Sequence, residues 1–208
     1  LSIAYGEADQ IFSEIINLYE ITNVFSHEET GLKLTYERDK KLKIFFNAKK
    51  IKWHEYQTNA VIRGLNNRKT WEKQWDKVMR DEIKPINLAQ ANIIFHPFPN
   101  SAIPKFKNDI NHQLGGCLPA QKEMNDFFEA RGQDYFKFIS KPDKSRTSCS
   151  RLSPYIAYGN LSMREVYQTL LKSWNKTGWR RSMAALSSRL HWHCHFIQKY
   201  ESEIDIED

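Results

Sequence analysis

The chain has 208 residues, of which 40% are hydrophobic and 27% are charged, a balance that excludes an intrinsically disordered protein. No apolar stretch approaches the roughly 20 residues that a membrane-spanning helix needs, and no signal peptide is visible. The formal net charge of +6 permits contact with nucleic acid without requiring it. The 3 cysteines include no Cys-x-x-Cys pair, which argues against a disulfide framework and predicts a reducing compartment. We therefore expect the protein in the cytoplasm, associated with the nucleoid if it is bacterial, or elsewhere inside the cell.

The first 80 residues alternate between helical and extended patterns. Apolar residues at helical spacing predict helices over Asp9–Tyr19 and Thr35–Lys49. Two short runs predict strands, at Asn23–Ser26 and at Ile51–Tyr56. We expect the first of these strands to be buried. Alternation of this kind is typical of a parallel sheet with helical crossovers. Because the chain opens at Leu1 without an initiator methionine, we expect a fragment, with further strands before its start.

His27, Glu28 and Glu29 raise the question of a metal site in this region. Adjacent residues of an extended segment point to opposite faces, so we expect no metal there. Arg38 and Asp39 are more typical of a structural ion pair or a helix cap.

Residues 81–118 predict a long connector, because prolines interrupt any helix. Phe95, Phe98 and Phe106 are interpreted as anchors of this connector. Gly115-Gly116 and the apolar spacing after it then indicate the start of a helix.

Ser148 to Ser162 contains the strongest functional signal. Ser153 is predicted to be the N-cap of a helix and Pro154 its first residue, so that unpaired amides and the helix dipole favour an anion. Gly159-Asn160 predicts a helix end, with Ser162 capping the next helix. The alternative is a well-capped loop without a ligand.

The last third of the chain predicts two more helices. One spans Arg164–Ser173, and the other spans Ser182–Tyr200 with apolar residues every three to four positions. Between them, Lys172–Arg181 mixes basic and aromatic residues, which suits either nucleic-acid contact or a solvated turn. His191 and His195 lie one turn apart without an evident third ligand, so we expect no metal site.

Several of these stretches resemble the photolyase and cryptochrome family. Ser148-Cys149-Ser150-Arg151-Leu152-Ser153-Pro154 is similar to its flavin-phosphate segment. Trp53-His54-Glu55 and Gly115-Gly116 are similar to its α/β domain and to the entry to its helical domain. The resemblance implies a mainly helical fold: an α/β remnant at 1–80, a connector at 81–118 and half of a helical FAD-binding domain at 119–208.

The resemblance also implies roles for individual residues. By position, the residues expected to contact the phosphates of FAD are Tyr135, Cys149, Ser150, Arg151, Leu152 and Ser153. For Tyr135, a half-buried core position is the alternative. Trp192 occupies the position at which members of the family have a tryptophan that stacks on a DNA lesion. Arg189 stands where repairing members of the family have a glutamate that contacts the damaged base. His193 stands where the family usually has an arginine of the flavin domain, and it is a candidate cofactor contact.

Three functions follow as hypotheses. The first is a fragment of a FAD-dependent photolyase, a lyase that repairs pyrimidine dimers in damaged DNA by light-driven electron transfer. The second is a cryptochrome-like photoreceptor without repair activity, favoured by Arg189. The third is a flavin-free helical module that binds nucleic acid through Lys172–Arg181.

Overall fold

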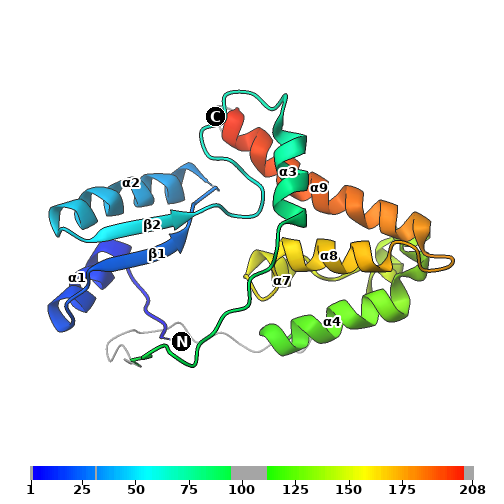
Figure 1. Ribbon diagram of the computed structural model, residues 1–208, viewed down its shortest axis with the longest axis horizontal. Helices are drawn as coiled ribbons and strands as arrows, with labels where there is room; N and C mark the ends of the chain where they lie inside the picture. The colour runs from blue at the N-terminus through cyan, green and yellow to red at the C-terminus, as the bar shows by residue number, and fades with distance from the viewer. Residues whose placement is uncertain (1, 31, 95–111, 204–208) are drawn as a thin grey trace. The chain divides into compact units, whose positions relative to one another are not determined.

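The computed structural model describes residues 2–30, 32–94 and 112–203, which form two compact units (Figure 1). The first unit contains the described residues of Leu1–Thr58 and Lys84–Asp109. The second contains those of Asn59–Ile83 and Ile110–Ile206. The first is a small α/β unit and the second is helical, so the fold is predominantly helical with a partial parallel sheet, as the sequence predicts.

The first unit is built on two parallel strands, β1 (Asn23–His27) and β2 (Lys52–Tyr56). Helix α1 (Ala8–Leu18) precedes β1, and α2 (Lys33–Ala48) connects the two strands. The predicted helices, strands and crossover are therefore confirmed, with bounds shifted by one or two residues. A core of Leu42, Phe46 and Ile51 forms where the helices cover one face of the sheet.

The opposite face of the sheet is exposed, which corrects the expectation that the first strand is buried. The Phe25 side chain is 64% exposed, and its ring stacks on His54 with centroids 4.7 Å apart. Val24, opposite Trp53 in the register, faces the core instead. The side chains alternate because only one face is covered by the helices of this unit.

The second unit packs four longer helices: α3 (Trp71–Arg80), α4 (Cys117–Glu129), α8 (Met163–Ser173) and α9 (Arg180–Ser202). Helix α8, labelled in Figure 1, contacts α3, α4 and α9. The short elements between α4 and α8 are η1 (Arg131–Asp134), α5 (Tyr135–Phe138), η2 (Pro142–Lys144), α6 (Ser145–Ser148) and α7 (Ser153–Ala157).

Helix α3 belongs to the helical unit, although the sequence places residues up to 80 with the α/β unit. Trp71 is buried and donates its indole hydrogen bond to the carbonyl oxygen of Ala60 at 2.8 Å. Trp75 packs edge-on against Tyr167 of α8 and His191 of α9, with centroids 4.9 and 5.0 Å apart. These contacts move the division from residue 80 to the junction between Thr58 and Asn59.

The ends of α4 and α8 follow the predicted signals. Gly116 precedes α4 with φ of 110°, a backbone conformation that favours glycine. Ser162 accepts a hydrogen bond from the amide of Glu165, whose carboxylate accepts one from the Ser162 amide, so α8 starts with a capping box.

In α9, the buried side chains are Ser182, Met183, Leu186, Leu190, Cys194 and Gln198. Cys194 therefore occupies the core position, and His193 is only partly buried. Phe95, Phe98 and Phe106 lie outside the described residues. None of the helices described here is long and apolar enough to span a membrane.

Candidate functional site: an amide nest at 151–153

Helix α7 begins one residue earlier than the sequence predicts. Leu152 is its N-cap, Ser153 is its first residue, and no side chain caps it. The prediction that Ser153 is the N-cap is therefore wrong. The Ser153 side chain is exposed and makes no hydrogen bond within the described chain. A helix of 5 residues also has a weak dipole, so any anion site must come from the preceding loop.

That loop has the backbone geometry of an anion site. Arg151 has φ of 57°, which is left-handed, and Leu152 follows at φ −89° and ψ −12°, which is right-handed. Alternation of this kind turns successive amides toward one point. The N–H groups of Arg151, Leu152 and Ser153, which this alternation orients, have no hydrogen-bond partner in the described part of the chain. We call these three N–H groups the amide nest.

The carbonyl groups of the same loop are all engaged. The guanidinium of Arg131 binds the carbonyl oxygens of Cys149 and Ser150, the latter at 3.2 Å. Gln113 donates to the carbonyl oxygen of Arg151 at 3.0 Å, and the Leu152 carbonyl accepts the Ile156 amide at 3.0 Å. Because the acceptors point at these donors, the loop is fixed with its amides still free.

Arg131 is the functional residue that sequence reasoning missed. It also pairs with Glu123 and Asp126 of α4, and only 12% of its side chain is exposed. It therefore ties α4 to the loop of the amide nest. A lone arginine 18 residues from its carbonyl partner leaves no local pattern in the sequence.

Tyr135 lies in the core, which is the alternative considered from the sequence. Its ring packs edge-on against Phe127 at 5.5 Å, and burial raises its pKa to about 12. Cys149 raises this pKa further and Arg189 lowers it, so the phenol lies within electrostatic reach of both. Burial also raises the pKa of the Cys149 thiol.

Arg189, Trp192 and Phe196 form an exposed stripe on α9. The Arg189 guanidinium lies 4.5 Å from the centre of the Trp192 ring, in a cation–π arrangement. The Trp192 side chain is 46% exposed, and Phe196 packs edge-on against it at 6.1 Å. Burial lowers the pKa of the neighbouring His193, so the histidine is poor at carrying the charge of the arginine expected from the family.

His191 and His195 serve packing. Their rings stack 6.1 Å apart, and Trp71 lies 5.1 Å from the first and 5.8 Å from the second. Arg68 approaches His195 Nε2 at 3.3 Å. Within the described residues, no three His, Cys, Asp or Glu side chains come together as metal ligands.

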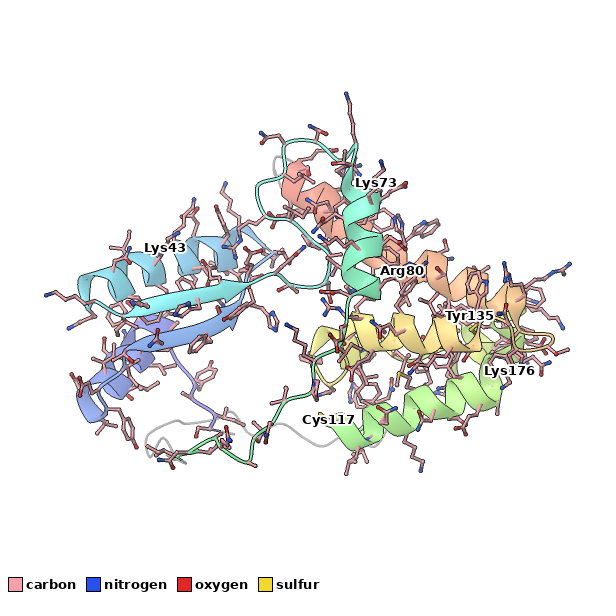
Figure 2. The ribbon with its side chains drawn as sticks, viewed as in Figure 1. Lys43, Lys73, Arg80, Cys117, Tyr135 and Lys176 are labelled. Carbon is pink, nitrogen blue, oxygen red and sulfur yellow. The ribbon has the colours of Figure 1, made fainter. Side chains whose placement is uncertain are left out.

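The basic and aromatic run at 172–181 is also used internally. Trp179 is buried, and Lys176 lies 3.8 Å from the centre of its ring. Lys176, labelled in Figure 2, donates to the carbonyl oxygens of Phe128 and Glu129 and so caps the end of α4. The Trp174 ring lies under the Arg180 guanidinium at 4.5 Å.

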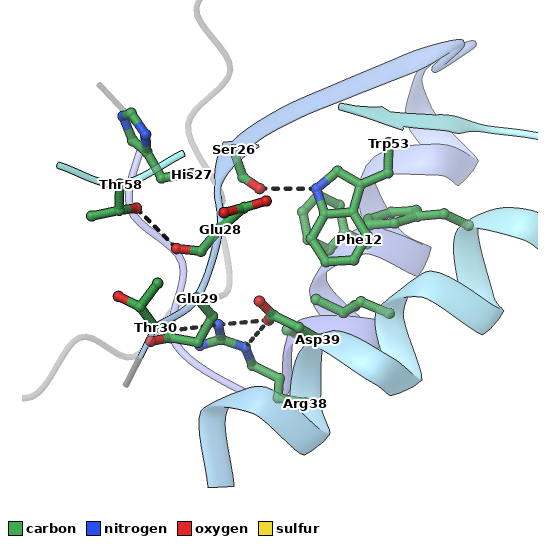
Figure 3. A pocket seen from close by; sticks show the side chains of 13 residues that line it. Phe12, Ser26, His27, Glu28, Glu29, Thr30, Arg38, Asp39, Trp53 and Thr58 are labelled. Carbon is green, nitrogen blue, oxygen red and sulfur yellow. Dashed lines mark hydrogen bonds and ion pairs between the residues drawn. The ribbon is translucent and has the colours of Figure 1, made fainter. Parts of the chain in front are cut away.

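The first unit has its own pocket, of about 490 Å³, beside the carboxyl end of β1 (Figure 3). Phe12 and Trp53 form its apolar part, and Trp53 donates to the Ser26 hydroxyl at 2.9 Å. Arg38 pairs with both Glu29 and Asp39, which confirms the predicted ion pair. Several polar groups of this pocket, in the pairs Trp53–Ser26, Arg38–Glu29 and Arg38–Asp39, therefore satisfy one another.

Comparison with known proteins identifies the fold. No protein-family model matches the sequence, and no curated protein is similar to it. Among solved structures, the crystal structure of a cryptochrome from Synechocystis sp. PCC6803 is similar, with a TM-score of 0.65 and 18% sequence identity. The similarity covers 96% of this chain and 45% of that chain, so this chain spans less than half of that protein. At this identity the likeness is one of fold.

Proposed function

We propose that the second unit binds the diphosphate of flavin adenine dinucleotide on the amide nest, as part of a flavoprotein of the photolyase and cryptochrome type. The observation that carries the proposal is the set of three convergent amides without a partner in the described chain. A diphosphate needs several donors at one point, and a nest supplies them at no cost in side-chain ordering. The fold likeness to a cryptochrome adds support.

The residues around the nest fit this role. The Arg151 side chain adds positive charge, and the exposed Ser153 hydroxyl supplies a further donor. The Cys149 side chain, where the family usually has a threonine, is partly buried, which matters little if backbone amides hold the phosphates. A bound flavin supplies light-driven electron transfer, and the residues of this chain bind it, orient it and limit the access of water.

Repair of pyrimidine dimers in damaged DNA is the first candidate for the activity. The half-exposed Trp192 ring offers a stacking surface for an unpaired base. Signalling without repair is the second candidate. It is favoured by Arg189, whose guanidinium already covers one face of that ring and replaces the usual carboxylate. A flavin-free nucleic-acid module has less support, because Trp179 and Lys176 are engaged in packing.

Flavin binding is tested with two variants of Arg151. The purified protein is titrated with FAD, and quenching of flavin fluorescence is followed. Arg151→Gly keeps the amide and the left-handed backbone, so we expect most of the affinity to remain. Arg151→Val disfavours that backbone and should weaken binding about tenfold or more.

Equal loss of affinity in both variants would show that the side chain, and not the nest, binds the phosphates. Absence of flavin binding by the unaltered protein would overturn the proposal. With the flavin bound, illumination of an oligonucleotide that contains a thymine dimer separates the two candidates. Restored thymines identify repair, and an unchanged dimer favours signalling.

A further inference from the structure

A hollow of about 500 Å³ lies next to the loop of the amide nest, where the stretch before α4 meets α7. Its walls include Gln113, Arg146, Arg151, Tyr155, Tyr158 and Asn160. No residue of α9 lines it, so the hollow is distinct from the surface that carries Trp192. No role follows for it from the flavin proposal.

The walls of this hollow are tied together by hydrogen bonds. Gln113 donates to the carbonyl oxygen of Arg151 at 3.0 Å, and the Gly116 amide donates to Asn160 Oδ1 at 3.4 Å. The Asn160 amide in turn donates to the carbonyl oxygen of Tyr155 at 2.8 Å. The hollow is therefore formed before any ligand arrives, as small-molecule sites usually are.

The charge of the walls is positive. Among the residues that the structure describes, two guanidinium groups line the hollow and no carboxylate does. Arg146 is exposed and has no ion-pair partner among the residues described. Arg151 lies 3.6 Å from Glu123, whose carboxylate also binds Arg131 and is therefore shared. Such a pair of guanidinium groups is suited to a phosphate or carboxylate.

Two tyrosines give the hollow an aromatic surface. Tyr155 is buried, whereas the Tyr158 side chain is 85% exposed. An aromatic side chain this exposed lacks the packing that would explain its size, and it offers a ring face at the mouth. Guanidinium groups beside an accessible ring form the combination that binds a planar base joined to a phosphate.

We propose that this hollow binds a nucleoside phosphate, with the phosphate between Arg146 and Arg151 and the base on Tyr158. Its volume lies within the range of about 300–1,000 Å³ typical of small-molecule sites. The nucleoside phosphate is either a free mononucleotide or one nucleotide of a single strand. The proposal does not rest on flavin binding, because the hollow binds through side chains and the amide nest binds mainly through backbone groups. The Arg151 side chain is the one group that both proposals use.

The test is a calorimetric titration of the full chain with AMP, adenosine and inorganic phosphate. We expect AMP to bind about tenfold more tightly than adenosine or inorganic phosphate alone, since the site holds both the base and the phosphate. A short oligodeoxynucleotide distinguishes the source: stronger binding than AMP identifies a strand, and weaker binding identifies a free nucleotide. If neither AMP nor the oligonucleotide binds, the proposal is overturned.

Variants locate the site. Arg146→Gln and Tyr158→Ala should each weaken AMP binding about tenfold or more, and Tyr158→Phe should retain it because the ring remains. Lys73→Gln removes a charge from α3, away from the hollow, and should leave AMP binding unchanged. FAD binding should be unaffected in Arg146→Gln. Displacement of AMP by FAD, or equal effects of Lys73→Gln and Arg146→Gln, would contradict a separate site.

Discussion

Gln198 shows how a single residue joins distant parts of the helical unit. It is fully buried in α9, accepts a hydrogen bond from the Ile62 amide at 2.7 Å and donates to the Ile62 carbonyl at 3.0 Å. One amide side chain thus satisfies both backbone groups of a residue 136 positions away. Buried polar groups of this kind are costly to leave unpaired.

We therefore expect Gln198→Met to destabilise the second unit. Methionine has a similar volume but can pair with neither group of Ile62, so the free energy of unfolding should fall by about 2–4 kcal/mol. Urea denaturation followed by tryptophan fluorescence measures the change. Gln121→Met, at an exposed position of α4, serves as the matched control and should be nearly neutral. Similar losses in both variants would argue against the buried pairing.

At the scale of elements, α8 depends on its capping box. The Ser162 hydroxyl accepts from the Glu165 amide at 3.0 Å, and the Glu165 carboxylate accepts from the Ser162 amide at 2.8 Å. Ser162→Ala should lower the free energy of unfolding by about 1 kcal/mol. Thermal unfolding measures it, with the exposed Ser188→Ala in α9 as control. A neutral Ser162→Ala would mean that packing alone holds the start of α8.

The junction of α3 and α9 should be sensitive to pH. Burial lowers the pKa of His191 below its usual 6.5, and His195 lowers it further, against the opposing effect of Glu72. The folded state therefore holds fewer protons than the unfolded state. This contribution to stability is complete above a pH of about 6.5 and is lost as the pH falls from there toward the lowered pKa.

We expect the second unit to be less stable at about pH 5 than at about pH 7.5, in denaturant titrations at both values. His191→Phe keeps a ring against Trp71 and Trp75 but cannot be protonated, so it should reduce the difference. His193, whose pKa burial also lowers, accounts for part of what remains. His54→Gln in the first unit is the control. An unchanged difference in His191→Phe would exclude this histidine as a source.

At the scale of the whole molecule, the described residues form two hydrophobic cores, one in each unit. Leu42, Phe46 and Ile51 form the core of the α/β unit, and the larger core of the helical unit shares no residue with it. Phe46 is 1% exposed, with Phe12 at 4.9 Å and Trp53 at 5.4 Å between ring centroids. Each core should therefore respond to its own mutations.

Phe46→Ala should destabilise the first unit by about 3–5 kcal/mol, because it leaves a cavity among these rings. Hydrogen exchange of backbone amides resolves the two units. We expect faster exchange in α2 and β2 and unchanged exchange in α8 and α9. Leu170→Ala, buried in α8, should produce the opposite pattern. Loss of protection throughout the chain in either variant would indicate one cooperative core.

Local features of the sequence were sufficient to predict most elements of this protein. The spacing of apolar residues in α2, α8 and α9 and the capping pair Ser162 and Glu165 act within one or two helical turns. Parallel pairing of β1 and β2 followed from their alternation with helices. The Ser153 cap failed because the left-handed turn at Arg151 moves the helix start, and no local pattern predicts a positive φ at an arginine.

The sequence by itself determined the helix periods, the crossover and the polar segment at 148–162, because these depend on neighbours along the chain. Only the tertiary structure decided which groups of that segment stay free. Arg131 and Gln113, distant in sequence, engage its carbonyl oxygens and leave its amides unpaired. The tertiary structure likewise assigned α3 to the helical unit, since the aromatic partners of Trp71 and Trp75 lie on α9 and α8. The physical reason is that buried polar and aromatic groups need partners, and folding brings those partners from far along the chain.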